Sequence, residues 1–258
     1  MSYAPLDLTN KTAVVIGGTS GIGLAIAKGL AKAGASVVAT GRRAELVQSV
    51  TAEIKASGGE SLAVPCDVTN RASIEALLAA VVGEYGSVEI LVNSAGTTKR
   101  TPSLDVSDAE WNNILEINLN GTFRACQVFG RHMIERKYGR IINIASVASF
   151  LALFEVAAYC ASKGAVAMLT KALAVEWGKH GVCVNAIAPG VYRTDLNAGL
   201  LDGTARGAEF KLRNPMGRFG QLDELIGAAI FLASDSASYT NGHILAVDGG
   251  MLASGVNQ

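Results

Sequence analysis

Three side chains in the middle of the chain have the types and the spacing that proton transfer needs. Tyr159 and Lys163 lie four residues apart in a segment with helical periodicity, so both should point from one face of a helix. A phenol with an ordinary pKa of about 10 is a poor acid or base at neutral pH, and a neighbouring cation favours its ionised form. Ser146 follows the apolar run 141–145 and adds a hydroxyl at the end of an expected strand. A lone Tyr-x-x-x-Lys pair is usually a surface pair, but together with Ser146 it predicts a general acid–base site.

A glycine-rich turn indicates a second site, one for a dinucleotide. It lies between the apolar run 13–16 and the first helical segment. Gly17 permits the sharp turn, Gly21 lets the backbone approach a pyrophosphate, and Gly23 lets the helix pack closely on the strand. A merely structural turn is the alternative. The residues expected at the phosphates are Gly17, Thr19, Ser20, Gly21, Ile22 and Gly23.

The end of the second apolar run bears on the choice of cofactor. A site that selects NAD carries a carboxylate there for the ribose hydroxyls. This chain has Gly41 followed by Arg42 and Arg43, and guanidinium groups suit a 2′-phosphate through charge-assisted hydrogen bonds. We therefore predict a preference for NADP(H) over NAD(H). The alternative is that both arginines only begin a solvated helix.

Strands and helices in alternation must position these residues. Short apolar runs without polar alternation are typical of strands buried on both faces. They occur at 13–16, 36–39, 61–64, 90–92, 141–144, 182–187 and 244–247. Segments with helical periodicity lie between them, which predicts an α/β fold: a single-domain, Rossmann-type, doubly wound, seven-stranded parallel sheet with helices on both faces. We expect residues 1–258 to form one dinucleotide-binding catalytic domain, in which the long connection 189–221 is a substrate lid.

Composition and charge argue against several other classes of protein. The 22 lysines and arginines balance 22 acidic residues, so no net basic field exists to attract nucleic acid. The four cysteines contain no C-x-x-C pair and the three histidines lie far apart, so we expect no disulfide framework and no metal site. The first residues lack the pattern of a signal peptide, and glycines and lysines interrupt the most apolar stretch, 13–35. We therefore expect a cytoplasmic protein without a membrane span.

Taken in order, the motifs resemble those of the short-chain dehydrogenase/reductase family over essentially the whole chain. They are Gly17-x3-Gly21-Ile22-Gly23, Asp67-Val68, Asn93-Ser94-Ala95-Gly96, Asn118, Ser146, Tyr159-x-x-Ser162-Lys163, Pro189-Gly190 with Thr194, and Val247-Asp248-Gly249-Gly250. The resemblance implies that Tyr159 is the general acid/base and that Ser146 binds the substrate oxygen. It also implies that Lys163 holds the nicotinamide ribose and that Asn118 keeps a water that relays protons. Further cofactor contacts are implied at Asp67, Val68, Asn93, Ala95, Gly96, Tyr159, Lys163, Pro189, Gly190, Tyr192 and Thr194.

Three positions depart from the family pattern. Ser94 replaces the second asparagine of N-N-A-G, and Ala145 precedes Ser146 where the family often has serine. Tyr192 stands where the family usually has a small branched residue, so we expect an altered contact with the nicotinamide carboxamide.

Within the family the chain resembles the group of gluconate 5-dehydrogenases and 2-deoxy-gluconate dehydrogenases. Lys99-Arg100-Thr101-Pro102 and the segment 215–220 carry this resemblance. It implies an NAD(P)-dependent enzyme that interconverts a secondary alcohol and a ketone on a sugar acid or polyol. Lys99 and Arg100 would then bind the substrate carboxylate, with Ser146 and Tyr159 at the reacting carbon.

Two other kinds of function stay open. One is an enzyme similar to 3-oxoacyl-carrier-protein reductases or glucose 1-dehydrogenases, which share parts of these motifs. The other is a non-enzymatic cofactor-binding regulator, although such proteins typically lose one of the three catalytic residues. The family resemblance also implies a homotetramer, and an apolar last helix and strand agree with that: Ile226, Ile230, Phe231, Leu232, Ile244 and Leu245.

Overall fold

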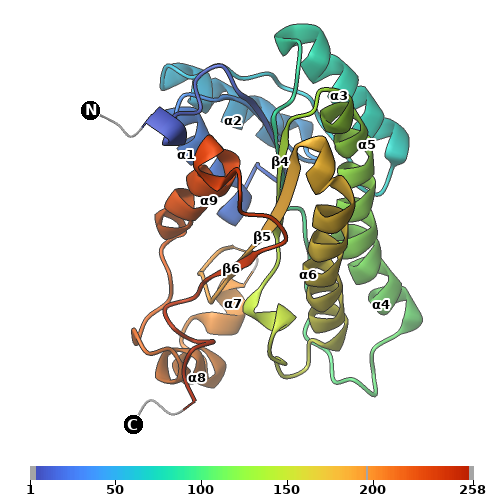
Figure 1. Ribbon diagram of the computed structural model, residues 1–258. Coiled ribbons are helices and arrows are strands. Elements are labelled where there is room, and N and C mark those ends of the chain that lie inside the picture. Colours follow the sequence, from blue (N-terminus) through green and yellow to red (C-terminus); the bar gives the residue numbers. More distant parts are fainter. Residues whose placement is uncertain (1–3, 196, 256–258) are drawn as a thin grey trace.

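The computed structural model describes residues 4–195 and 197–255, and within them a single parallel sheet runs through the molecule (Figure 1). The sheet order is β2-β1-β3-β4-β5-β6. The strands are β1 Thr12–Ile16, β2 Ser36–Thr40, β3 Ile90–Asn93, β4 Gly139–Ile144, β5 Val182–Pro189 and β6 Ile244–Val247. The expected domain 1–258 and lid 189–221 include residues 1–3, Leu196 and 256–258, which lie outside the described part of the chain.

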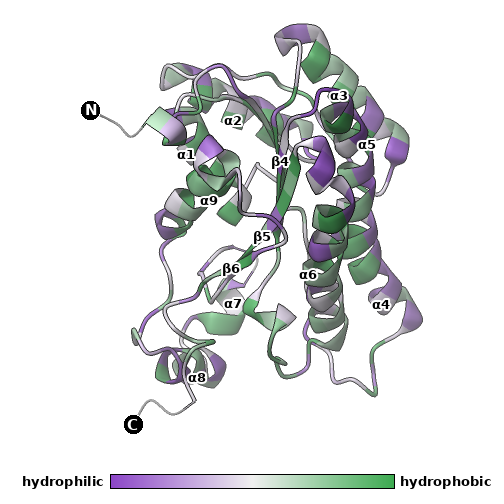
Figure 2. Cartoon of the chain, viewed as in Figure 1, coloured by the Kyte–Doolittle hydropathy of each residue, from purple (hydrophilic) through white to green (hydrophobic). Residues whose placement is uncertain are grey.

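Helices cover both faces of this sheet, as expected. Successive strand residues point to opposite faces, so Val14 belongs to one hydrophobic cluster and Val15 to the other. The cluster around Val15 includes residues of α1 (Gly21–Lys32), α2 (Ala44–Ala56) and α9 (Ile226–Ala233). The cluster around Val14 includes residues of α3 (Arg71–Tyr85), α5 (Gly121–Glu135) and α6 (Ala157–Trp177). Figure 2 shows the hydrophobic colouring of the central strands that these two layers enclose.

Shorter elements lie at the edges of the two layers. α4 (Asp108–Leu115) passes through a π-helical turn, Glu116–Asn120, directly into α5. α7 (Ala198–Leu201) and α8 (Ala205–Arg213) lie in the expected lid. Single 3₁₀ turns occupy Ala4–Leu6, Val147–Ser149, Gly178–His180, Leu222–Leu225 and Asp235–Ala237.

The predicted strand at 61–64 is wrong, because the described part of the sheet has six strands. The segment lies beside the outer edge of β2, and main-chain hydrogen bonds join the two near the ends of the segment. Val37 N donates to Glu60 O at 2.9 Å, and Cys66 N donates to Gly41 O at 3.0 Å. Between these bonds the Thr40 hydroxyl donates to the carbonyl of Val64, and Pro65 has no N–H to donate. A side chain and a proline therefore interrupt the ladder that would make this segment a strand.

The parallel register brings the carboxyl ends of the central strands to one level. Ile16 pairs with Thr40 on one side and with Asn93 on the other, and Asn93 pairs with Asn143. The chain leaves β1 toward β2 on one side and returns through β3 on the other, which makes a crevice between β1 and β3. Ligands of open parallel sheets bind in such a crevice.

Two further observations concern the chain as a whole. None of the described helices is both long and apolar enough to cross a membrane. Cys66, Cys126, Cys160 and Cys183 are all free thiols.

Candidate active site

Helix α6 carries Tyr159 and Lys163 to the carboxyl end of β4. Lys163 is 6% exposed, and its Nζ donates to the carbonyl of Ile144 at 2.6 Å. The same Nζ lies 5.8 Å from the centroid of the Tyr159 ring. Ser146, two residues beyond β4, is hydrogen-bonded to the Tyr159 side chain, and its Oγ accepts from Ala148 N at 3.1 Å. The structure therefore brings the three predicted acid–base residues together.

Burial controls the protonation of two of these groups. It raises the pKa of Tyr159 above its usual value, against the opposing effect of the Ser146 hydrogen bond. It lowers the pKa of Lys163 to about 8. We expected the lysine cation to lower the pKa of the phenol, but burial raises it, and Lys163 is not among the groups that shift it. Tyr159 is accordingly protonated at neutral pH and ready to donate.

Asn118 joins the loop after β3 to α6. It is fully buried in the π-helical turn, where its Nδ2 donates to Thr97 O at 2.9 Å and to Ser162 Oγ at 3.0 Å. Its Oδ1 accepts from Thr97 N at 2.8 Å, and its main-chain carbonyl accepts from Thr122 Oγ1 at 2.8 Å. Both amide N–H groups are thus used within the protein. A water held by Asn118 would therefore bond to its Oδ1 or to its main-chain carbonyl, each of which accepts one hydrogen bond and can accept a second.

The glycine turn leaves no space for side chains. Gly17 has φ +80°, and a Cβ there would lie 2.5 Å from Ala95 N at the end of β3. A Cβ on Gly23 would lie 2.1 Å from Gly17 O, so α1 packs directly on the turn. Gly21 has φ +53°, and a Cβ there would lie 3.3 Å from the methyl group of Thr194, which follows β5. The turn is therefore enclosed by the ends of two other strands.

The N-terminus of α1 faces this enclosure. Ser20 has an extended backbone at the N-cap, and within residues 4–195 and 197–255 its side chain makes no capping hydrogen bond. The first amide groups of a helix have no partner inside the helix, and an anion satisfies them well. Thr19 and Ile22 are half-buried beside the turn, and Ser20 is exposed. These residues fit the pyrophosphate of a dinucleotide.

The two predicted phosphate-binding arginines are exposed after β2. A Cβ on Gly41 would lie 3.1 Å from Thr19 Oγ1, so the end of β2 adjoins the glycine turn. Arg42 helps to lower the pKa of Asp67, after hydrogen bonds from Thr69 that have the larger effect. Arg43 is the N-cap residue of α2. Arg42 and Asp67 thus lie at the same end of the crevice.

Some predicted cofactor contacts are possible only through the backbone. The Asn93 side chain is buried, and its Nδ2 donates to Asn143 Oδ1 at 2.9 Å inside the core. Val68 is also buried and belongs to the hydrophobic cluster beneath the sheet. Gly96 is exposed, and a Cβ there would lie 3.8 Å from Lys163 Nζ. The backbone after β3 therefore adjoins Lys163.

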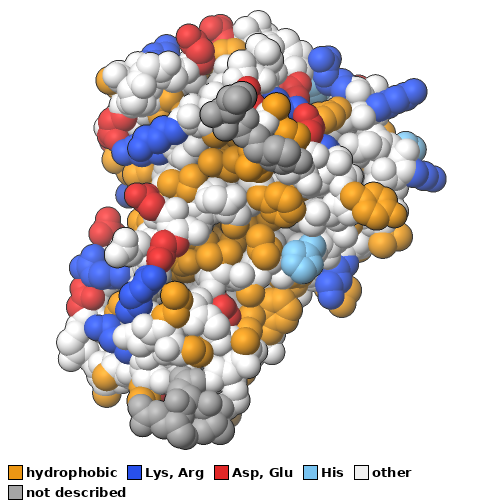
Figure 3. All heavy atoms as spheres, turned by 60° about the vertical axis from the view of Figure 1, so that its left-hand side comes forward, with side chains coloured by type: hydrophobic (Ala, Val, Ile, Leu, Met, Phe, Trp, Pro, Cys, Tyr) orange, Lys and Arg blue, Asp and Glu red, His pale blue; other side chains and the backbone are white. Residues whose placement is uncertain are grey.

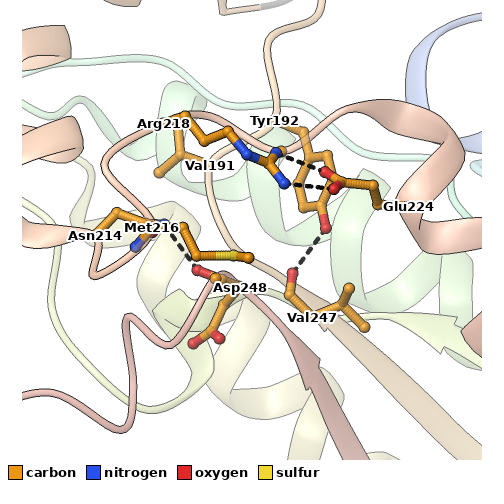
Figure 4. A pocket seen from close by; sticks show the side chains of 10 residues that line it. Val191, Tyr192, Asn214, Met216, Arg218, Glu224, Val247 and Asp248 are labelled. Atoms are coloured by element: carbon orange, nitrogen blue, oxygen red, sulfur yellow. Dashed lines mark hydrogen bonds and ion pairs between the residues drawn. The ribbon is translucent and has the colours of Figure 1, made fainter.

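Tyr192 points away from the site that we expected it to serve. Its ring is 5% exposed, and its hydroxyl donates to Val247 O at 3.0 Å. Burial raises the pKa of this phenol to about 12. The ring fills one side of a pocket between the lid and the last strand, where Arg218 and Glu224 form an ion pair (Figure 4). Gly190 N donates to the same carbonyl of Val247 at 3.0 Å, so Pro189 and Gly190 tie the lid to β6.

The two predicted substrate cations both meet carboxylates. Lys99 Nζ lies 2.6 Å from Glu110 Oε2 of α4. Arg100 Nε and Nη2 each lie 2.6 Å from Glu155 Oε2, in the loop between Ser146 and Tyr159. Arg100 thus lies beside the catalytic segment, whereas Lys99 is drawn toward α4.

One cation near this loop did not stand out in the sequence. Arg206 of α8 donates from Nη1 to Phe154 O at 3.0 Å. The signal available was its position in the expected lid, but the lid contains several other cations. Only the contact with the loop distinguishes Arg206 from them.

Comparisons with known proteins agree with this geometry. A family model described as Enoyl-(Acyl carrier protein) reductase matches residues 17–252. The chain is 41% identical over 255 residues to gluconate 5-dehydrogenase of Gluconobacter oxydans, covering 98% of this chain and 100% of that one. It is 44% identical over 243 residues to D-threitol dehydrogenase of Mycolicibacterium smegmatis, covering 94% and 93%. A crystal structure of a gluconate 5-dehydrogenase from Burkholderia cenocepacia, in complex with NADP and tartrate, has a TM-score of 0.94 at 40% identity, covering 97% of this chain and 98% of that one.

A parallel sheet with a glycine turn after β1 and a buried Tyr-x-x-x-Lys pair on α6 is typical of a class of nicotinamide-dependent oxidoreductases. The chain belongs to the short-chain dehydrogenase/reductase family. It is an NAD(P)-dependent oxidoreductase that interconverts a secondary alcohol and a ketone. The expected resemblance to gluconate 5-dehydrogenases is confirmed.

Proposed function

We propose that the enzyme interconverts a secondary hydroxyl and a ketone on a sugar acid, with NADP(H) as the preferred cofactor. The observation that carries this proposal is the ion pair between Arg100, in the loop after β3, and Glu155, in the loop that joins Ser146 to Tyr159. A planar guanidinium can hold a carboxylate bidentately and so fix which carbon faces the acid–base group. The similarity to gluconate 5-dehydrogenases supports a carboxylate-bearing substrate.

The residues present fit a nicotinamide dinucleotide. The glycine turn and the uncapped start of α1 suit the pyrophosphate, and Lys163 would hold the ribose next to the nicotinamide. The backbone around Ala95 and Gly96 would face the adenine ribose, Asp67 and Val68 would lie at the adenine, and the segment from Pro189 to Thr194 would close over the nicotinamide end. When bound, the cofactor supplies the hydride acceptor for oxidation and the hydride donor for reduction.

The acid–base residues act on the substrate oxygen. In ketone reduction, Tyr159 donates its proton to the carbonyl oxygen, while the Ser146 hydroxyl hydrogen-bonds that oxygen and stabilises its developing charge. In alcohol oxidation, Tyr159 must first lose its proton, and it then accepts the proton of the substrate hydroxyl. Lys163 stabilises the phenolate, and the carbonyl of Asn118 would hold the water that carries the proton onward.

Replacing Tyr159 with phenylalanine tests whether the protein is an enzyme that uses Tyr159 as its acid–base group or a non-enzymatic cofactor-binding regulator. Tyr159→Phe keeps the ring and removes the exchangeable proton, so kcat should fall by at least about tenfold, a loss of roughly 1.4 kcal/mol or more of transition-state stabilisation. NADP(H) binding, followed by nicotinamide fluorescence, should stay close to wild type. Retention of most of kcat would contradict the acid–base assignment, and a wild-type protein that binds NADP(H) but turns over no alcohol or ketone would be a regulator.

The cofactor preference rests on Arg42 and Arg43, both exposed after β2 with no acid between them. Arg42→Ala should raise the KM for NADP by about tenfold or more and barely change the KM for NAD, because only NADP carries the 2′-phosphate. Equal kcat/KM for the two cofactors in the wild type would show that the arginines only begin a solvated helix.

The substrate class is tested with gluconate and its neutral counterpart, glucitol. Arg100→Ala should raise the KM for gluconate about tenfold and leave the KM for glucitol nearly unchanged. Acyl thioesters and glucose belong in the same activity screen, because the other two enzyme classes would prefer them. A wild type that prefers acyl thioesters would overturn the sugar-acid reading.

We also propose that the enzyme is a cytoplasmic homotetramer. Its four free thiols suit a reducing compartment. Figure 3 shows hydrophobic side chains gathered across the face where α9 and β6 come forward. Ile226, Ile230, Phe231, Ile244 and Leu245 are all only partly buried there. Leu232, which we had placed on the same face, is 1% exposed and belongs to the core. A monomeric mass in light scattering at micromolar concentration would contradict the tetramer.

A further inference from the structure

Arg206 of helix α8 contacts the loop between Ser146 and Tyr159, which we call the catalytic loop. The helix begins at a cap, because Gly207 N donates to Thr204 Oγ1 at 3.0 Å. It packs tightly on α7, since a Cβ on Gly207 would lie 1.9 Å from Leu201 O. Arg206, one residue before this contact, also lies with its guanidinium 5.4 Å from the Phe210 ring. Its place therefore follows from the local packing of the lid.

Arg206 and Arg100 converge on two consecutive residues. Arg206 Nη1 donates to Phe154 O at 3.0 Å, and Arg100 binds the Glu155 carboxylate with Nε and Nη2, both at 2.6 Å. The Arg100 guanidinium also lies 6.0 Å from the Phe154 ring. Two cations from different elements, one from the lid and one from the loop after β3, thus meet at one point of the loop.

The charges at this point do not cancel. Burial and the nearby Arg100 cation both lower the pKa of Arg206, while Glu155 and Glu209 oppose them. Glu209 is already paired with Arg213 at 2.8 Å. Glu155 is therefore left to face two guanidinium groups, and a further carboxylate would be attracted there.

The guanidinium of Arg206 can donate further hydrogen bonds. Within residues 4–195 and 197–255 it makes one hydrogen bond, to Phe154 O, although a guanidinium has several N–H donors.

The loop that Arg206 contacts has an unusual backbone conformation. Glu155 has φ +61°, an uncommon value for this residue, and Thr101 N holds its carbonyl at 2.8 Å. Non-glycine residues with such a φ persist where their surroundings fix them, and they gather at ligand sites.

The two residues that the arginines contact, Phe154 and Glu155, lie close to Tyr159 in the sequence. Glu155 precedes Tyr159 by four residues, and Leu153 N, just before Phe154, donates to the thiol sulfur of Cys160, just after Tyr159, at 3.4 Å. A carboxylate held between the arginines would thus place the rest of a small substrate beside the phenol.

We infer that Arg206 determines substrate specificity: together with Arg100 it binds the carboxylate of the sugar acid, while Glu155 occupies this place when no substrate is bound. This inference rests on the proposed function. It adds a residue of the lid to the substrate site, so that the lid recognises the substrate as well as covering it.

Kinetics of Arg206→Gln test the inference, with Arg213→Gln as the matched control. Arg213 lies on the same helix, is exposed, and is already paired with Glu209. We expect Arg206→Gln to raise the KM for gluconate about tenfold while the KM for glucitol, kcat and the Kd for NADP stay within about twofold of wild type. Arg213→Gln should leave all four values unchanged.

A second measurement is independent of turnover. Glutarate carries carboxylates but no hydroxyl to oxidise. In the presence of NADP it should raise the Tm of the wild type and of Arg213→Gln, but not that of Arg206→Gln. The two ideas can therefore fail separately. A wild type that turns over no sugar acid contradicts the proposed function, and the glutarate measurement still decides the role of Arg206.

Two results would overturn the inference. If Arg206→Gln raises the KM for gluconate and glucitol equally, Arg206 only braces the loop through Phe154. If gluconate kinetics and glutarate stabilisation are both unchanged, the carboxylate binds elsewhere.

Discussion

Lys163 carries a buried ammonium whose contribution to stability depends on pH. Its ammonium is buried, with one hydrogen bond to Ile144 O, and its pKa is lowered to about 8. A lysine whose pKa is lowered in the folded state takes up a proton more readily when the chain unfolds. Its effect on stability is therefore most favourable above the unfolded pKa and is lost as the pH falls through about 8.

Lys163→Met should abolish turnover and yet gain stability relative to wild type as the pH is lowered. From pH 10 to pH 7, the difference in unfolding free energy should shift in favour of the variant by up to about 3 kcal/mol, at about 1.4 kcal/mol for each pKa unit. Urea unfolding across this pH range measures the shift. Lys171→Met, on the exposed side of the same helix, is the control. A difference that does not change with pH would contradict the buried charge.

Gly23 and Gly83 make a matched pair for the glycine turn. Both lie in helices, but a Cβ on Gly23 would lie 2.1 Å from Gly17 O, whereas on Gly83 it would meet nothing within 4 Å. Gly23→Ala should weaken NADP binding and cost about 2 kcal/mol or more of stability, because backbone must move. Gly83→Ala should stabilise by about 0.5–1 kcal/mol, the ordinary gain in a helix. Equal effects of the two changes on NADP binding would show that close packing at the turn is unimportant.

At this scale, the sequence predicts residue types better than side-chain directions. Tyr159 and Lys163 could be placed together because four residues make about one helical turn. Asn93 and Tyr192 match motif positions, yet their side chains turn into the core and into the pocket of the last strand. Nothing in their neighbours along the chain indicates which way they turn.

Among the elements, a hydrogen bond to the imidazole of His132 joins helix α5 to the loop before β3, and protonation of the imidazole would break it. His132 Nε2 accepts from Val88 N at 3.2 Å. Burial, followed by the Arg136 cation, lowers the pKa of His132, while Glu89 and Glu135 oppose this. The imidazole is therefore neutral in the folded protein. Its contribution to stability is present above pH 6.5 and is lost as the pH falls through the lower folded pKa.

His132→Gln should make stability less dependent on pH, because the amide oxygen of glutamine can accept the Val88 N–H without titrating. Between pH 7.5 and pH 5, the wild type should lose about 1 kcal/mol more than the variant, the typical value of one hydrogen bond. Chemical denaturation at both pH values gives the comparison, and His243→Gln, at an exposed position, serves as the control. Parallel losses in wild type and His132→Gln would contradict this role.

The elements were predictable wherever hydrophobic periodicity was strong. Six of the seven predicted runs are strands, and the five from β1 to β5 are buried on both faces, whereas β6 at the edge is only partly buried. The run 61–64 has the same apolar character, but Pro65 and the Thr40 hydroxyl break its pairing, and neither effect follows from periodicity. The contact of α8 with the catalytic loop depends on a long-range fold of the lid, which no local pattern specifies.

At the scale of the molecule, one polar cluster joins distant parts of the chain near the amino ends of β1 and β4. Asp235, just after α9, accepts from Tyr138 at 2.8 Å and forms ion pairs with Lys11 and Arg140. The Arg140 side chain is only 5% exposed. Removing the carboxylate would leave this cation buried with two carbonyls and the Tyr138 ring as partners, and buried cations without a counter-charge are costly.

Asp235→Asn should therefore destabilise the protein by about 2 kcal/mol, a value kept modest because Asp235 itself is half exposed. Asp223→Asn, in the exposed turn before α9, should change stability by less than about 0.5 kcal/mol. Urea unfolding at pH 7 compares the two variants. A loss for Asp235→Asn no larger than that of its control would show that the cluster adds nothing to stability.

The two edges of the sheet differ, and this difference limits how the molecules can associate. The outer edge of β2 is covered by the segment from Glu60 to Cys66, whereas in the described chain no segment pairs with the outer edge of β6. Strand edges left open invite pairing with other chains, and two such edges on one molecule would allow growth in both directions. A molecule with only one open edge can add a single neighbour along the sheet, and a two-fold pair then closes it. By covering the outer edge of β2, the segment from Glu60 to Cys66 leaves the sheet unable to extend at both edges, which disfavours growth into fibres.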